Sequence, residues 1–114
     1  MSLDAQSFVS ALAFNEAGLI PVVVQEHSTH KVLMLAWMNA ESVALTLETK
    51  RATYWSRSRS ELWIKGETSG NTQHVISLAY DCDQDALLMT VEQHGPACHT
   101  GSTTCFDDHI IELS

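Results

Sequence analysis

Apolar residues recur along this chain at two different spacings, one typical of helices and one of strands. Four apolar residues between positions 8 and 13 follow a near-helical spacing, and Asp4 can cap their start, so we predict a short amphipathic helix over residues 4–14. Asn39 can cap a second helix that runs to about residue 50. The apolar residues that share one face of this second helix are Val43, Ala44 and Leu47.

Six short runs are rich in β-branched, aromatic and other apolar residues and predict strands. They lie at residues 19–25, 31–37, 53–59, 62–65, 75–80 and 86–92. The polar segment EHSTH at 26–30 predicts a hairpin turn between the first two. Because the chain has no long alternation of strand and helix, we predict an α+β fold, a mainly antiparallel β-sheet with one or two short helices. At 114 residues, we expect a single domain over residues 1–114.

The composition narrows the classes of partner. The formal net charge of −8 disfavours broad binding to nucleic acid or to an anionic membrane, because both favour a basic surface. The N-terminus lacks the features of a secretory signal, and no apolar run approaches the ~18 residues of a membrane span. We therefore expect a cytoplasmic protein that binds neither nucleic acid nor membrane. In that reducing compartment, three cysteines are more often metal ligands, nucleophiles or buried side chains than disulfides.

One segment runs against the acidic composition, because five of the six cationic residues fall within residues 50–65. If residues 53–59 form a strand, alternation places Trp55, Arg57 and Arg59 on one face. A tryptophan beside two guanidinium groups suits a planar base that carries a phosphate, since arginine binds phosphate through two hydrogen bonds and aromatic rings stack on bases. The alternative is a solvated edge strand whose arginines prevent aggregation.

The adjoining sequence KGETSGN, residues 65–71, contains two glycines, two hydroxyl groups and a carboxylate. Exposed backbone N–H groups in such a loop can hold a phosphate. Lys65, Glu67 and Ser69 are therefore candidate substrate-binding residues.

Three aspartates follow the predicted fifth strand at spacing i, i+2, i+4. In an extended chain the carboxylates of Asp81, Asp83 and Asp85 point the same way, at steps of roughly 7 Å. Three like charges in a row are tolerated either by full solvation in a turn or by a bound hard cation such as Mg²⁺. Both interpretations stay open from the spacing alone.

All three cysteines lie within residues 81–106. In extended chain Cys82 points away from the aspartates that flank it, while Cys98 and Cys105 enclose a loop rich in Gly, Ser and Thr. Three thiolates match a catalytic zinc site, which keeps one position open for water. The alternative is two buried cysteines and one incidental surface thiol. His99 directly follows Cys98 and can carry a proton near such a water.

Together, YWSRSRSELWIKGETSGNTQ at 54–73 and DCDQDALLMTVEQHGPACHTGSTTCF at 81–106 resemble the phosphoribosyl-AMP cyclohydrolase family, and LMLAWMNAESVALTLET at 33–49 fits it too. The resemblance implies hydrolysis of the N1–C6 bond of the adenine in 1-(5-phosphoribosyl)-AMP, a step of histidine biosynthesis that gives a formimino carboxamide ribotide. It also implies an intertwined homodimer.

The resemblance implies roles for the candidate residues. Zinc would be bound by Cys82, Cys98 and Cys105, with Cys82 reaching the zinc held by the other two cysteines of the partner subunit, and Mg²⁺ by Asp81, Asp83 and Asp85. His99 would move a proton and Trp55 stack on a base. The two phosphates would be held by Arg57, Arg59 and Lys65.

Two departures from the family pattern are Ser102, where a basic residue is frequent, and Thr104, where serine is common. Because the chain ends eight residues after Phe106, we expect the monofunctional form of the enzyme. Two other classes of function stay open. One is a non-catalytic, zinc-stabilised nucleotide-binding module, and the other is a Mg²⁺-dependent phosphohydrolase that uses the aspartates.

Overall fold

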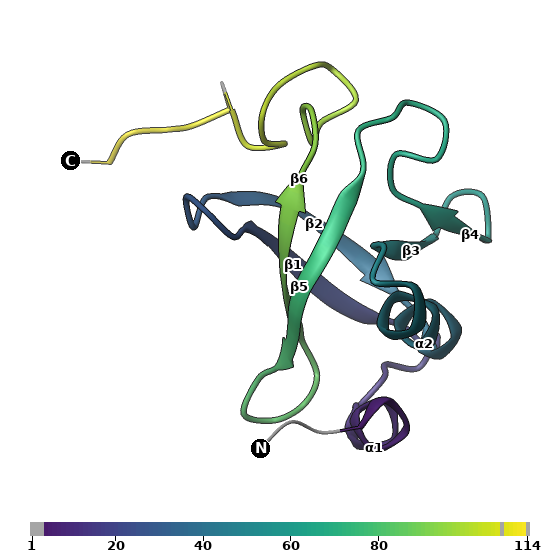
Figure 1. Ribbon diagram of the computed structural model, residues 1–114. Helices are drawn as coiled ribbons and strands as arrows, with labels where there is room; N and C mark the ends of the chain where they lie inside the picture. Colours follow the sequence, from purple (N-terminus) through teal and green to yellow (C-terminus); the bar gives the residue numbers. More distant parts are fainter. Residues whose placement is uncertain (1–3, 108, 114) are drawn as a thin grey trace.

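The computed structural model describes residues 4–107 and 109–113, and Figure 1 shows the arrangement of its elements. The helices are α1 (Ala5–Ala11) and α2 (Ala40–Thr49). The strands are β1 (Ile20–Glu26), β2 (Val32–Met38), β3 (Thr53–Ser56), β4 (Glu61–Ile64), β5 (Gln73–Tyr80) and β6 (Leu87–Gln93). The predicted α+β class is therefore confirmed. No helix among the described residues is long and apolar enough to cross a membrane.

Four strands form one sheet in the order β2-β1-β6-β5, and β3 and β4 form a separate two-stranded ladder. The pairs β1–β2, β5–β6 and β3–β4 are antiparallel, which confirms the mainly antiparallel pairing predicted from the sequence. The pair β1–β6 is parallel. This pair joins segments far apart in the sequence, so no local pattern indicates it.

The core lies on one face of the four-stranded sheet. Ile20, Val22 and Val24 alternate along β1 and are fully buried, while β6 contributes Met89 and Val91 to the same face. Helix α2 packs against β2 and β3, and α1 packs against α2. Burial of this alternating set provides the main stabilisation of the fold, about 25 cal/mol for each Å² of apolar surface removed from water.

Helix α2 begins where the sequence predicted, because Asn39 and Ser42 form a capping box. The Asn39 side-chain oxygen accepts from the Ser42 N–H at 2.8 Å, and the Ser42 hydroxyl accepts from the Asn39 N–H at 2.9 Å. The helix ends at Thr49, and the next residue, Lys50, caps it in the left-handed conformation with a φ of 61°.

Helix α1 is shorter than predicted, since it ends at Ala11 and not at residue 14. Its first turn has the predicted cap, in which Asp4 accepts from the Ser7 N–H at 2.8 Å. After the helix the chain becomes extended at Leu12, which is buried, and the Ala13 N–H donates to the Gln84 carbonyl at 2.8 Å. A partner in the β5–β6 turn has thus replaced the next helical hydrogen bond.

Strand β3 ends at Ser56, so the predicted strand over residues 53–59 is three residues too long. Residues 57–60 form a turn in which the Ser56 hydroxyl accepts from the Arg59 N–H at 3.3 Å, and Ser60 has a φ of 51°. The placement of Trp55, Arg57 and Arg59 in one row on a strand face is therefore wrong. The serine hydroxyl, by bonding local backbone, favours the turn over a longer ladder.

The small ladder is joined to the large sheet through Ala52. The Ala52 N–H donates to the Gln73 carbonyl at 3.1 Å, and its carbonyl accepts from the Lys65 N–H at 3.0 Å. Next to it, the Val75 N–H donates to the Lys50 carbonyl at 2.8 Å. These bonds fix the end of β4 close to the start of β5.

A chain of buried polar side chains reinforces the same junction. The Tyr54 hydroxyl donates to the Gln73 side-chain oxygen, and the Gln73 amide donates to the Gln93 side-chain oxygen at 2.7 Å. The Gln93 amide then donates to the carbonyls of Asn71 and Thr72, each at 3.4 Å. The chain thus links β3, β5 and β6 to the loop that precedes β5.

We expect Tyr54→Phe to lower the free energy of unfolding by about 1–3 kcal/mol, because it leaves the buried Gln73 oxygen without its donor. Urea unfolding would measure the loss. Tyr80→Phe is the matched control, since Tyr80 packs on Phe8 and its hydroxyl has no hydrogen bond among the described residues. Equal losses in the two variants would contradict the assignment.

Candidate active site

A cleft of about 450 Å³ lies between β4, the loop that follows it and the loop after β6. Six of the candidate residues line it: Arg59, Lys65, Glu67, Ser69, Cys98 and His99. They come from three segments of the sequence. The hydrogen bonds of Ala52 and the buried polar side chains of Tyr54, Gln73 and Gln93 hold these segments together. The cleft therefore combines cationic groups, hydroxyl and carboxylate groups, a thiol and an imidazole.

The loop at residues 66–72 is a closed turn that uses most of its own N–H groups. The Gly70 N–H donates to the Gly66 carbonyl at 2.8 Å, and the Asn71 N–H donates to the Ser69 hydroxyl at 3.2 Å. Among the described residues, the N–H groups of Gly66, Thr68 and Ser69 have no acceptor, and all three residues line the cleft. These three N–H groups are available to bind an anion.

Two glycines allow close backbone packing here, Gly66 within this loop and Gly95 between this loop and the loop after β6. Gly66 has a φ of 81°, and a Cβ built on it would lie 2.5 Å from the backbone nitrogen of Thr72. A Cβ on Gly95 would lie 2.3 Å from the side-chain oxygen of Asn71. The closed shape of the 66–72 loop therefore depends on the absence of a side chain at Gly66, and its contact with the next loop depends on the absence of one at Gly95.

The loop after β6 brings two of the three thiols together. The Cys98 N–H donates to the Ser102 carbonyl at 3.2 Å, and the Gly101 N–H donates to the Cys98 carbonyl at 3.0 Å, which closes a tight turn. The Cys105 N–H donates to the Leu33 carbonyl at 2.8 Å and fixes the loop to β2. With both ends held, the side chains of Cys98 and Cys105 lie close enough for each thiol to shift the pKa of the other.

The two thiols have different electrostatic surroundings. The Thr100 hydroxyl donates to the Cys98 sulfur at 3.1 Å and holds the pKa of Cys98 below its ordinary value. Desolvation, followed by the neighbouring Cys98 sulfur, raises the pKa of Cys105. Burial lowers the pKa of Lys65, although the two nearby thiols oppose that shift. A divalent metal that prefers thiolate would fit this pair, because one sulfur is already biased toward its anionic form.

The third thiol is far from this pair within one chain. Cys82 is exposed in the turn between β5 and β6, whereas Cys98 lies in the loop at the other end of β6 (Figure 1). Strand β6 has 7 residues and therefore separates the two loops by roughly 20 Å. Because residues 81–85 form a turn, the argument that strand alternation separates Cys82 from the aspartates is wrong.

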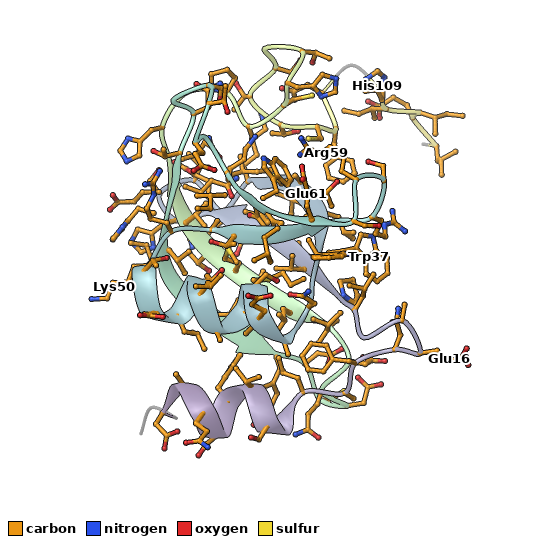
Figure 2. The ribbon with its side chains drawn as sticks, turned by 90° about the vertical axis from the view of Figure 1, so that its right-hand side faces the viewer. Glu16, Trp37, Lys50, Arg59, Glu61 and His109 are labelled. Atoms are coloured by element: carbon orange, nitrogen blue, oxygen red, sulfur yellow. The ribbon has the colours of Figure 1, made fainter. Side chains whose placement is uncertain are left out.

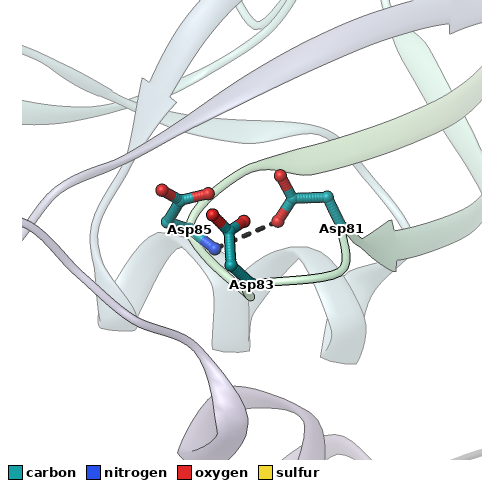
Figure 3. A group of neighbouring side chains, drawn as sticks. All are labelled: Asp81, Asp83 and Asp85. Carbon is teal, nitrogen blue, oxygen red and sulfur yellow. Dashed lines mark hydrogen bonds between the residues drawn. The ribbon is translucent and has the colours of Figure 1, made fainter.

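The same turn gathers the three aspartates. Asp81 accepts a hydrogen bond from the Asp85 N–H at 3.1 Å (Figure 3). It accepts a second from the Ala86 N–H at 3.2 Å, and the two bonds curl the chain. One oxygen from each of Asp81, Asp83 and Asp85 lies within 4.8 Å of the others. The predicted cluster is present, but a turn forms it and not an extended strand with 7 Å steps.

Because these exposed carboxylates are crowded, the pKa values of Asp83 and Asp85 move in opposite directions. A hydrogen bond between Asp83 and Asp85 lowers the pKa of Asp83 and raises that of Asp85, and the charges of the neighbouring aspartates add to the second shift. Negative charge is thus concentrated in this turn. A hard divalent cation with oxygen ligands fits the same position, because it would neutralise that charge.

The two arginines of the turn at 57–60 contact different side chains, Arg59 a carboxylate and Arg57 an aromatic ring. The Arg59 guanidinium lies 3.5 Å from the Glu61 carboxylate, and Figure 2 shows these two side chains near each other. The Arg57 guanidinium lies 4.7 Å from the centre of the Trp37 ring. Arg57 and Trp55 line a second hollow of about 560 Å³, and Trp63 lines both this hollow and the cleft.

Sequence reasoning missed several side chains near the cleft. Glu61, Trp63 and Asn71 line it, and Thr100 donates to Cys98. Alternation from Lys65 back through β4 could have indicated Trp63 and Glu61, since these residues share one strand face. No local signal marks Asn71 or Thr100, because their roles depend on contacts between loops.

Comparison with known proteins places this site in a family. The family model described as phosphoribosyl-AMP cyclohydrolase matches residues 34–107, which include every candidate site residue. The chain belongs to the phosphoribosyl-AMP cyclohydrolase family. The resemblance noted in the sequence motifs is therefore confirmed.

Proteins named phosphoribosyl-AMP cyclohydrolase from three bacteria illustrate the similarity. The protein from Cereibacter sphaeroides strain KD131 is 61% identical over 97 residues, covering 85% of this chain and 82% of the relative. That from Roseobacter denitrificans is 61% identical over 107 residues, covering 90% and 84%. That from Micrococcus luteus is 60% identical over 98 residues, covering 86% and 78%.

We expect Gly66→Ala to destabilise the protein more than Gly70→Ala. Both glycines have φ near +80°, so each substitution incurs the cost of a left-handed residue, about 1–2 kcal/mol. Only the Gly66 substitution also places a methyl group against the Asn71 and Thr72 backbone. A methyl group on Gly70 would have no neighbouring atom within 4 Å. Thermal unfolding measures the difference, and equal losses would show that the close approach is unimportant.

Proposed function

We propose that this chain hydrolyses the N1–C6 bond of the adenine ring in 1-(5-phosphoribosyl)-AMP, a step of histidine biosynthesis. Family membership supports the substrate and the reaction. The observation that carries the proposal is the cleft itself, which is lined by Cys98 and His99 together with Arg59 and the loop at residues 66–72. Such a cleft can hold a phosphorylated base with its ring next to the thiols. Because thiol ligands need a reducing compartment, we expect the enzyme to act in the cytoplasm.

The substrate carries two phosphoribosyl groups, so it needs anion-binding groups at two places. In the cleft, the first place is formed by Arg59 and by the N–H groups of the 66–72 loop that have no acceptor, and Glu67 can accept hydrogen bonds from ribose hydroxyls. We assign Arg57 to the second phosphate and Trp55 to stacking, because the hollow they line shares Trp63 with the cleft.

We propose that zinc is bound by Cys98 and Cys105 of one chain and Cys82 of a second copy. Two neighbouring thiols within one chain supply only part of a three-thiolate set, and a length of about 20 Å along β6 keeps the third away. A homodimer in which each turn at 81–85 reaches the other chain's cleft would complete both sites.

The same arrangement explains the position of the carboxylates. Cys82 lies between Asp81 and Asp83, so a partner subunit that contributes this thiol also brings its acidic turn to the cleft. Mg²⁺ held by Asp81, Asp83 and Asp85 would then lie close to the substrate phosphates. Its positive charge would offset the repulsion between the phosphates and the carboxylates.

In the reaction, the oxygen of a water bonds to C6 of the purine, the N1–C6 bond breaks, and N1 receives a proton. Bound zinc supplies Lewis acidity that lowers the pKa of water toward ~7. His99 lines the cleft next to Cys98 and is our candidate for carrying the proton from water to N1. Arg59 and the loop N–H groups keep the ring from moving during the transfer.

We expect purified protein to open the purine ring in a spectroscopic assay with phosphoribosyl-AMP. A zinc chelator should abolish turnover, and added zinc should restore it. Cys98→Ser should remain folded by circular dichroism yet lose at least ~100-fold in kcat/KM, because a metal Lewis acid is worth several kcal/mol of transition-state stabilisation.

Three outcomes would contradict the proposed function or the catalytic role of the metal. Folded, zinc-loaded protein without ring opening would indicate a nucleotide-binding module. Release of inorganic phosphate by the Cys98→Ser variant would favour a phosphohydrolase that uses the aspartates. Unfolding of Cys98→Ser would show that the metal is structural.

Shared zinc sites predict complementation between two inactive variants. Cys82→Ser and Cys98→Ser should each be inactive alone. When the two chains are co-expressed, half of the dimers are mixed and one of their two sites is intact, so about a quarter of wild-type activity should return. If each chain builds its own site, the mixture should stay inactive.

A further inference from the structure

Lys65 differs from the other cationic side chains because it is buried. Only 9% of the residue is exposed, whereas the Arg59 side chain at the rim of the same cleft is 59% exposed. The Lys65 ammonium donates to the Ala97 carbonyl at 2.6 Å and lies 5.5 Å from the centre of the Trp63 ring. A buried ammonium held by a carbonyl and an aromatic face has little freedom to follow a ligand.

The acceptor of this hydrogen bond lies at the base of the cysteine loop. Ala97 directly precedes Cys98 and is 2% exposed, and its N–H donates to the Thr103 carbonyl at 3.1 Å. The Lys65 side chain therefore connects the end of β4 to the point where the loop closes. Without it, the buried Ala97 carbonyl would lose its ammonium donor, and the loop would lose its contact with the ladder.

The ammonium also balances charge at the thiols. Lys65 and Cys98 line the same cleft, and the lysine is close enough to interact electrostatically with both Cys98 and Cys105. Three thiolates around one divalent zinc leave a net negative charge, which is costly in a partly buried site unless a cation lies near it. Groups that orient metal ligands without touching the metal commonly change metal affinity by ~10- to 100-fold.

We propose that Lys65 is a positioning residue of the cysteine loop, whose ammonium, held by the Ala97 carbonyl, keeps Cys98 and Cys105 in place to bind metal. This inference rests on the proposed zinc site. It differs from the phosphate contact that the sequence predicted for Lys65. Loss of a phosphate contact and loss of a positioning contact affect different measured quantities. A phosphate ligand affects chiefly the KM for substrate, whereas a positioning residue affects metal affinity even without substrate.

The test compares Lys65→Met with Arg59→Met and Lys50→Met in full-length protein. Zinc affinity is measured without substrate, by competition with a chromophoric chelator. The thiolate-to-metal absorption of the cobalt-substituted protein reports the ligand geometry. We expect Lys65→Met to weaken zinc binding ~10- to 100-fold and to alter the cobalt spectrum. With zinc at saturation, its KM should stay close to that of the wild type.

The comparison variants separate the two roles. Arg59→Met should raise KM and leave zinc affinity unchanged. Lys50→Met removes the same charge from an exposed position at the end of α2 and should leave zinc affinity unchanged. Lys65→Arg, which keeps the charge and the donor, should recover part of the zinc affinity. If Lys65→Met does not fold, Lys65→Gln keeps a donor without the charge and should still bind zinc more weakly.

The inference is overturned if Lys65→Met or Lys65→Gln binds zinc as tightly as the wild type, above all if KM rises instead. In that case the proposed function can still hold, because the wild type would bind zinc and open the purine ring. Wild-type protein that binds no zinc at the thiols would overturn both proposals.

Discussion

The hydrogen-bonded chain from Tyr54 through Gln73 to Gln93 is the constraint on which the rest of this structure depends. It crosses the boundary between the small ladder and the large sheet, and it ends on the backbone of the loop that lines the cleft. Apolar packing holds each layer together but does not specify how the layers are oriented. Buried polar groups specify the orientation of the layers, because each group has few acceptable hydrogen-bond partners. The cleft keeps its shape because this junction has one arrangement in which all its members are satisfied.

Most of the fold could be predicted from local patterns, and each error has a physical cause. Helix α2 was predicted closely because its start depends on a capping box within four residues. The strand over residues 53–59 was predicted too long because period-two spacing presumes extended backbone, whereas the Ser56 hydroxyl bonds the backbone of Arg59 and favours a turn. The parallel pairing of β1 with β6 had no local signal, since it depends on packing between distant segments.

The candidate site was predicted by residue type better than by geometry. The acidic and thiol residues were identified from chemistry that few other residue types provide, but their positions were deduced from an extended chain that is in fact curled. The grouping of Arg59, Lys65 and Cys98 in one cleft could not be deduced from spacing, because it requires three segments to meet. The family motifs supplied that information, as they reflect the folded arrangement indirectly.

Strand β6 also restricts how this protein can change in length. In the proposed dimer, each chain binds one zinc through Cys98 and Cys105 and contributes Cys82 to the zinc site of the other chain. Strand β6 and its flanking turns set the distance between these two positions of one chain. An insertion of two residues in β6 would preserve which side chains face the core, yet it would displace one end by about 7 Å. Such a protein could fold normally and fail to assemble its metal sites. Insertions and deletions should therefore be rare between residues 82 and 98, even at exposed positions.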